Sequence, residues 1–462
     1  MAKEKAKTKL SLGLSGAFGQ FFAIFGLALV VSVSGNLGLG PLLIGLGLAT
    51  IVSLIFARNH HSIWATPAFL FLPALIIFSR GLETLPIGSP VWNFRIGGLL
   101  VSLWVSGLVY IVLATIVRYI GATKMRRIFS PIFSGIIIVL LALSVLPRVI
   151  QFAYLEPLQA ASGTSVKLII IMSSSFLGYL MVTIFSKKPG AQARYALLIG
   201  IASGVVATTL IDAIELLWLS RLLENTIFFK QFTPGMYDGV PLTVFHNLEA
   251  SFGFWQYLHF DLESMLLFVP LVLVAVSEHI HAMTKYVLQN KEGDQNADAA
   301  KTLIGEGISI LIGGMTSGYP LTIDENIVHI ATSSKKSHLG VVIPLAVLMV
   351  GLGIFIPFSY TLTLIPLPVI GGVLIAWAGY EAALGFSRVS SLVHDQLHPL
   401  GTSLSLVVLG LGMTLVIFEF ISDYLGDSSL RFMIGTTPFP SYLIVIVIAF
   451  IINLFFPKLV VV

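Results

Sequence analysis

Long apolar runs constrain this chain more than any other feature of its sequence. Of its 462 residues, 56% are hydrophobic and 10% are charged, whereas a soluble domain carries about 25% charged residues. A helix needs ~20 apolar residues to cross a bilayer. The sequence therefore predicts an all-α polytopic membrane protein. Fourteen stretches are candidate spans, at residues 14–35, 38–57, 63–80, 94–117, 129–147, 167–186, 195–219, 263–287, 300–315, 318–333, 338–359, 367–387, 402–421 and 440–457.

Basic residues predict which ends of these spans face the cytoplasm. With the N-terminus inside, 19 of the 26 Lys and Arg residues fall in cytoplasmic loops, in keeping with the positive-inside rule. An even number of spans also keeps Lys458 inside. We therefore expect a multi-pass protein of the cell membrane with both termini in the cytoplasm. The basic start, MAKEKAKTK, is then a flank of the first span, and neither a signal peptide nor a nucleic-acid-binding tail.

The residues that could support catalysis or metal binding are poorly arranged for either. The chain has no cysteine, which excludes disulfides and thiolate chemistry. A metal site built from Glu278, His281 and His329 would lack the spacing of an HExxH motif. We expect no enzyme, no metal and no cofactor.

The two halves of the chain resemble each other weakly. The segment FSPIFSGIII (129–138) is similar to PLPVIGGVLI (366–375), and both ATPAFLFLP (65–73) and GYPLTIDEN (318–326) are apolar stretches interrupted by proline. Seven spans in each half would make the second half inverted, which is typical of secondary transporters. Chance similarity between apolar segments is the alternative.

Pro67 and Pro320 each interrupt an apolar segment. Proline removes a backbone donor and disfavours helix at the preceding residue, and non-helical backbone at membrane depth survives where it lines a cavity or is buried in protein. The third and tenth spans are therefore predicted to break into a short extended stretch followed by a half-helix, whose N-terminus favours polar or anionic atoms. An ordinary proline kink is the alternative.

Glu278 and Glu325 lie in very apolar sequence. An ionisable group at membrane depth costs about 2.5–3.5 kcal/mol on insertion scales and marks a functional site. On a helix, His281 is a neighbour of Glu278, which favours a proton-accepting pair. The alternatives are purely structural roles, in which Asp324 is a helix N-cap and Glu325 only complements a helix dipole.

Other acidic residues are interpreted more conservatively. Glu306 is expected to hold the core together by hydrogen bonds, with a place in a proton path as the alternative. Glu215, Glu381 and Glu419 lie near span ends and are expected to face loops or the membrane surface.

The segments VSEHIHAM, GEGISILIGGMTSGYPLTIDENIVHIAT and IPLPVIGGVLIAWAG resemble the nucleobase–cation symporter family (nucleobase–ascorbate transporters), in particular its bacterial uracil permeases. The resemblance implies a fold of 14 transmembrane segments in seven-plus-seven inverted repeats. Spans 1–4 and 8–11 would form a core domain from residues 1–120 and 263–360. Spans 5–7 with an external loop, and spans 12–14, would form a gate domain from residues 121–262 and 361–462, through which a homodimer could form.

The resemblance also implies a substrate site. The family's substrate-binding glutamates fall on Glu278 and Glu325, with Asp324 next to the second. An aromatic residue of the third span falls on Ala68 or Phe69, depending on where the gap is placed, and we choose Phe69. Glu278 and His281 would couple transport to a proton. Residues expected to support the site structurally are Asn326, Glu306 and Gln20. The sequence departs from the family pattern at Gln20 and Ala282, where the family has histidines, and at Asp324 and Val328, where it has glycines.

The implied function is import of a nucleobase, uracil or another pyrimidine, coupled to protons and operating by alternating access. The expected partners are the nucleobase and the lipid bilayer. A purine permease of the xanthine type is one alternative, although purine carriers usually have Gln at the position of Glu325. A sulfate- or bicarbonate-type anion transporter of the same fold is another, but such a site should be cationic.

Overall fold

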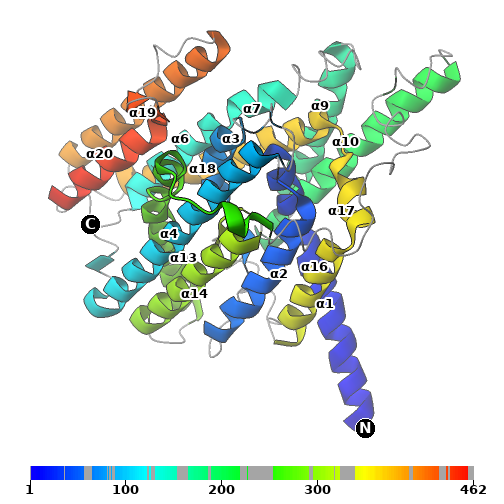
Figure 1. Ribbon diagram of the computed structural model, residues 1–462, viewed down its shortest axis with the longest axis horizontal. Coiled ribbons are helices and arrows are strands. Elements are labelled where there is room, and N and C mark those ends of the chain that lie inside the picture. The colour runs from blue at the N-terminus through cyan, green and yellow to red at the C-terminus, as the bar shows by residue number, and fades with distance from the viewer. Residues whose placement is uncertain are drawn as a thin grey trace. The chain divides into compact units, whose positions relative to one another are not determined.

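A computed structural model gives the fold of the chain (Figure 1). It describes residues 2–35, 37–56, 65–80, 82, 85, 89–121, 124–125, 131–152, 165–185, 189–218, 226, 253–290, 295–316, 318–322, 339–394, 399–425, 433–434 and 437–455.

Helices account for nearly all of the described residues. The long ones are α1 (Ala2–Ser34), α2 (Leu39–Phe56), α4 (Pro90–Ile120), α6 (Pro131–Ser144), α9 (Ser165–Phe185), α10 (Pro189–Trp218), α13 (Leu271–Asn290), α14 (Gln295–Thr316), α16 (Leu339–Ile354), α18 (Leu367–His394), α19 (Pro399–Leu425) and α20 (Ser441–Phe455). The short ones are η1 (Phe69–Phe71), α3 (Leu72–Arg80), α7 (Leu146–Ile150), η5 (Gly253–Tyr257), α12 (Leu262–Phe268) and α17 (Ile356–Thr363).

Seven helical stretches in the described residues are long and apolar enough to cross a membrane, and five shorter helices are also apolar. Their lengths and hydropathy follow directly from the apolar runs of the sequence. The prediction of an all-α polytopic membrane protein is confirmed. The inverted seven-plus-seven repeat agrees with this architecture and stays a prediction, as does the division into core and gate domains.

The chain forms two compact units. The first comprises Met1–Leu48, Leu146–Gly253 and His329–Trp377. In it α9 packs along α10, and α1 packs against both α10 and α16. A buried ion pair between Lys167 of α9 and Glu215 of α10 joins these two helices. Glu215 is therefore not loop-facing, and that interpretation of the sequence was wrong.

The second unit comprises Ala49–Val145, Phe254–Val328 and Ala378–Val462. Here α4 and α14 lie side by side (Figure 1), while α13 contacts α14, α6 and α4, and α6 packs against α19 and α20. Two short strands, β1 (Thr66–Pro67) and β2 (Leu321–Thr322), pair antiparallel in this unit. A second pair, β3 (Met433–Ile434) and β4 (Thr437–Pro438), precedes α20.

Close packing of α4 on α14 depends on two facing glycines. A Cβ atom at Gly107 would lie 2.7 Å from the carbonyl oxygen of Gly307. We expect Gly107→Ala to reduce stability by about 1–3 kcal/mol, because a backbone oxygen cannot move aside cheaply. Gly410→Ala in α19 is the matched control, since a Cβ there meets nothing within 4 Å. Thermal unfolding in detergent tests this, and equal melting temperatures for the two variants would contradict it.

Candidate functional site

The two segments broken by proline meet in the second unit. Thr66 pairs with Thr322 and Pro67 with Leu321, and the Thr66 hydroxyl donates to the Thr322 carbonyl oxygen at 3.3 Å. Chain segments about 250 residues apart in sequence are thereby joined through their extended backbone. The predicted extended stretches at Pro67 and Pro320 are confirmed, and a simple proline kink does not describe them.

Local geometry explains why these segments leave the helix. Gly318 has a φ of 68°, a left-handed conformation that favours glycine. The Tyr319 carbonyl approaches so closely that a Cβ at Gly313 would lie 2.2 Å from it. The Tyr319 hydroxyl in turn donates to the Ala68 carbonyl oxygen. After the extended Ala68, the chain enters η1 and α3, which supplies the half-helix expected in the third span.

A pocket lies beside the paired strands. It encloses about 510 Å³ of space between atoms, part of it open to the outside, and its walls come from η1, α6, α13, α14, β2 and α18. The lining residues are Ala68, Phe69, Leu70, Ile138, Leu141, Ala275, Glu278, Glu306, Thr322 and Glu381. The walls are thus largely apolar, and three carboxylic acids supply most of their polar groups.

Glu278 reaches the pocket from α13 and forms an ion pair with Arg388 of α18. An Arg388 Nη1 group donates to Glu278 Oε1. The side chain of Arg388 is 12% exposed and that of Glu278 is 20% exposed. A carboxylate that is largely out of water requires such a partner.

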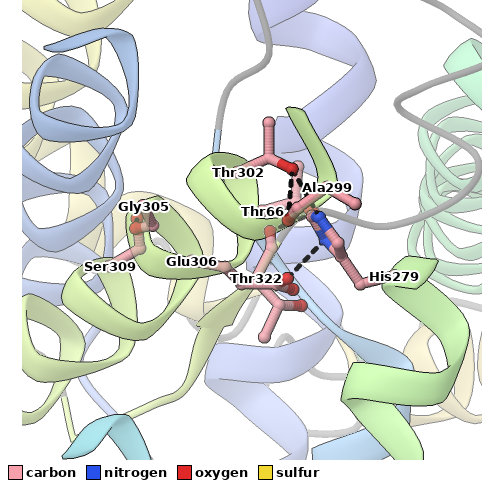
Figure 2. Close-up of polar contacts among 8 residues, drawn as sticks. All are labelled: Thr66, His279, Ala299, Thr302, Gly305, Glu306, Ser309 and Thr322. Atoms are coloured by element: carbon pink, nitrogen blue, oxygen red, sulfur yellow. Dashed lines mark hydrogen bonds and ion pairs between the residues drawn. The ribbon is translucent and has the colours of Figure 1, made fainter. Parts of the chain in front are cut away.

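A second acid of the pocket belongs to a buried polar network, which Figure 2 shows. His279 Nδ1 lies 2.6 Å from Glu306 Oε2, and His279 Nε2 lies 2.8 Å from Thr302 Oγ1. Because the Thr302 hydroxyl donates to the Ala299 carbonyl oxygen at 3.1 Å, it accepts from Nε2–H. One proton then lies between Nδ1 and Glu306, on either the imidazole or the acid.

The two ionisable side chains of this network are almost fully buried. The side chains of His279 and Glu306 are 1% and 2% exposed, and the fully buried Tyr110 of α4 lies beside Glu306. The contacts agree with the structural role expected for Glu306, since they join α13 to α14. They also leave a proton that could move, so the alternative of a proton path stays open.

The third acid of the pocket is Glu381, which sequence reasoning missed. It is 8% exposed, so the interpretation that it faces a loop or the membrane surface was wrong. Its spacing from Arg388 could have indicated that it faces the protein interior together with that residue. Seven residues are about two helical turns, which places both side chains on one face of α18.

The remaining predicted residues lie in different places. Phe69 is buried and lines the pocket, and its contact with a substrate stays a prediction. His281 is half-buried on α13, three residues after Glu278, and does not line the pocket. Gln20 is buried in α1 of the first unit. The predicted site residues Asp324, Glu325 and Asn326 lie outside the described residues.

No cluster of three or more His, Cys, Asp or Glu residues suited to a metal ion occurs in the part of the chain that the structure describes.

Comparison with known families and proteins points to membrane transport. Residues 13–419 match the sequence model of a family described as Permease family (Xan_ur_permease). The uric acid permease PucK of Bacillus subtilis is 24% identical over 300 residues, which cover 63% of this chain and 62% of that protein. The uracil permease of Bacillus caldolyticus is 22% identical over 399 residues, covering 85% of this chain and 83% of that protein.

Two solved transporters share the fold. The transmembrane domain of the cyanobacterial bicarbonate transporter BicA aligns with a TM-score of 0.50 and 15% identity, covering 91% of this chain and 98% of that one. The murine anion transporter Slc26a9 aligns with a TM-score of 0.55 and 11% identity, covering 96% of this chain and 68% of that one. At these identities the likeness concerns the fold alone.

Proposed function

The chain belongs to the Permease family, and from that premise we propose that it is a nucleobase importer of the cell membrane, with uracil or another pyrimidine as substrate and a proton as coupling ion. It is a transporter and not an enzyme. The observation that carries the substrate assignment is the pocket beside the paired strands, in which Glu278 and Phe69 lie together. Several relatives are uracil permeases, which supports a pyrimidine.

The chemistry of uracil fits this pocket. Uracil carries two N–H donors that alternate with two carbonyl acceptors along one side of its ring, all in one plane. A protonated carboxyl group offers one O–H donor and one carbonyl acceptor side by side, so a protonated Glu278 complements such an edge. Phe69 would stack on the ring face, and the extended backbone near residues 66–69 would meet the carbonyl groups.

The same chemistry couples the substrate to a proton. Because the N–H and C=O edge needs both a donor and an acceptor, substrate and proton would bind Glu278 together from outside and leave together inside. His281 would assist this transfer from the same helix. Movement of the core domain against the gate domain would supply alternating access, with both termini in the cytoplasm and a homodimer formed through the gate domain.

Residues outside the described segments complete the proposal. Glu325 would be the second substrate-binding carboxylate and Asp324 would lie next to the substrate. Asn326, Glu306 and Gln20 would support the site structurally.

Two other substrates compete with a pyrimidine. The similarity to a uric acid permease favours a purine as the second candidate. An anion carrier of the same fold is less suited, because three carboxylic acids line this pocket and would repel an anion.

Uptake into proteoliposomes tests these assignments. With an inward proton gradient, we expect radiolabelled uracil to accumulate at least severalfold above equilibrium, with xanthine weaker and sulfate excluded. Collapse of the gradient with a protonophore should remove the accumulation. Sulfate uptake without any nucleobase uptake would refute the proposal, and accumulation that follows a sodium gradient would refute the coupling ion.

A further inference from the structure

Arg388 has no part in the function proposed above, yet it contacts the central acid of the pocket. Its guanidinium donates to Glu278, and it is not one of the residues that line the pocket. It therefore reaches the carboxylate from beside the substrate space. An arginine remains protonated at any physiological pH, so this contact brings a permanent positive charge to Glu278.

The backbone holds Arg388 in this position. A Cβ at Gly135 of α6 would lie 2.9 Å from the Gly385 carbonyl oxygen and 3.2 Å from the Arg388 Cβ. Close contact between α6 and α18 therefore fixes the turn that carries Arg388. A partly buried ion pair on fixed backbone loses little side-chain freedom when it forms, which favours it over a surface pair.

Other ionisable groups around Glu278 are paired differently. Glu306 of α14 has His279 of α13 as its partner, and Tyr110 of α4 lies beside Glu306. Glu381 of α18 lines the same pocket, and His281 follows Glu278 by one helical turn. Among these groups, Arg388 contributes the fixed positive charge.

We propose that Arg388 is the positioning residue that keeps Glu278 unprotonated in the empty pocket, and that substrate and proton displace it together. This inference rests on the proposed function. A proton on either carboxyl oxygen removes the negative charge that attracts the guanidinium, so the proton and Arg388 compete for Glu278. The empty carrier then returns without a proton, which keeps the import of protons tied to the import of substrate.

Removal of the guanidinium should shift the pH dependence of uracil binding in a predictable direction. A largely buried carboxylate without its cation is neutralised by taking up a proton. In Arg388→Gln the protonated, substrate-accepting form of Glu278 should therefore persist to higher pH. We expect the pH at which uracil binding is half-maximal to rise by about one unit, which means about tenfold tighter binding at alkaline pH. A purely structural role of Arg388 would instead weaken binding at every pH.

The experiment measures uracil binding by purified protein in detergent between pH 5 and pH 9. Arg388→Lys keeps the charge and should restore the wild-type midpoint. Arg118→Gln is the matched control, because it removes one charge at an exposed position of α4 and should leave the midpoint unchanged. Weaker binding of Arg388→Gln with an unchanged midpoint would overturn the inference.

A second measurement uses the wild-type protein, so it does not depend on how the variants fold. In weakly buffered solution at pH 8, uracil binding should take up about one proton per site, detected with a pH-sensitive dye. Binding without proton uptake would overturn the inference and leave the nucleobase assignment standing. Absence of binding for uracil and for purines would refute the proposed function itself.

Discussion

Glu278→Gln should bind uracil but no longer accumulate it. Glutamine presents one donor and one acceptor, as a protonated carboxyl group does, so it can hold the N–H and C=O edge of the base. It cannot release a proton, so uptake driven by a proton gradient should fall to background, and binding should become independent of pH. Counterflow, in which internal unlabelled uracil exchanges with external labelled uracil, should persist, because exchange needs no net proton movement.

Glu278→Ala separates binding from coupling. It removes both hydrogen bonds to the base, each worth about 0.5–1.5 kcal/mol, so affinity should fall by about fivefold to a hundredfold. Both variants leave Arg388 without its acid, so Glu278→Gln should also be combined with Arg388→Gln to keep the pocket neutral. Glu263→Gln in α12 is the matched control, since Glu263 does not line the pocket. Wild-type uptake by Glu278→Ala would remove Glu278 from the site.

Hydropathy and proline placement made most of the fold predictable. Apolar runs long enough to span a bilayer leave helices as the main solution, because every backbone group must find a partner within the protein. Pro67 and Pro320 also predicted the extended stretches correctly. The pairing of these stretches was not predictable, because antiparallel contact between Thr66 and Thr322 depends on how the surrounding helices pack.

The sequence identified part of the lining of the candidate pocket, and the missing part has a physical cause. Glu278 and Phe69 were identified from their apolar surroundings and from the family resemblance. Glu381, Arg388 and Glu215 were not, because the sequence placed them near the ends of the predicted spans, where snorkelling to the membrane surface is the common outcome. Whether such a side chain turns inward depends on the partner that it finds, such as Glu278 for Arg388 and Lys167 for Glu215. These partners are distant in sequence.

Glu306→Ala should strongly destabilise the protein. The side chain of His279 is 1% exposed, and in this variant it would face a cavity where the Glu306 carboxyl group had been. Removal of one member of a buried ionic pair costs about 3–5 kcal/mol, so the melting temperature in detergent should drop strongly. Glu306→Gln should cost less, because an amide can still hydrogen-bond to Nδ1 but cannot exchange a proton with it.

The double variant His279→Leu with Glu306→Met tests whether this pair serves stability alone. Apolar side chains of similar volume in place of both partners often restore the stability that a single replacement loses. We expect the double variant to regain much of the stability that Glu306→Ala loses. If the pair only joins α13 to α14, the double variant should regain uracil uptake together with its stability.

If the proton between Nδ1 and Glu306 takes part in transport, the folded double variant should bind uracil without accumulating it. An unstable double variant would contradict the apolar replacement argument, and wild-type accumulation would exclude the pair from the proton path.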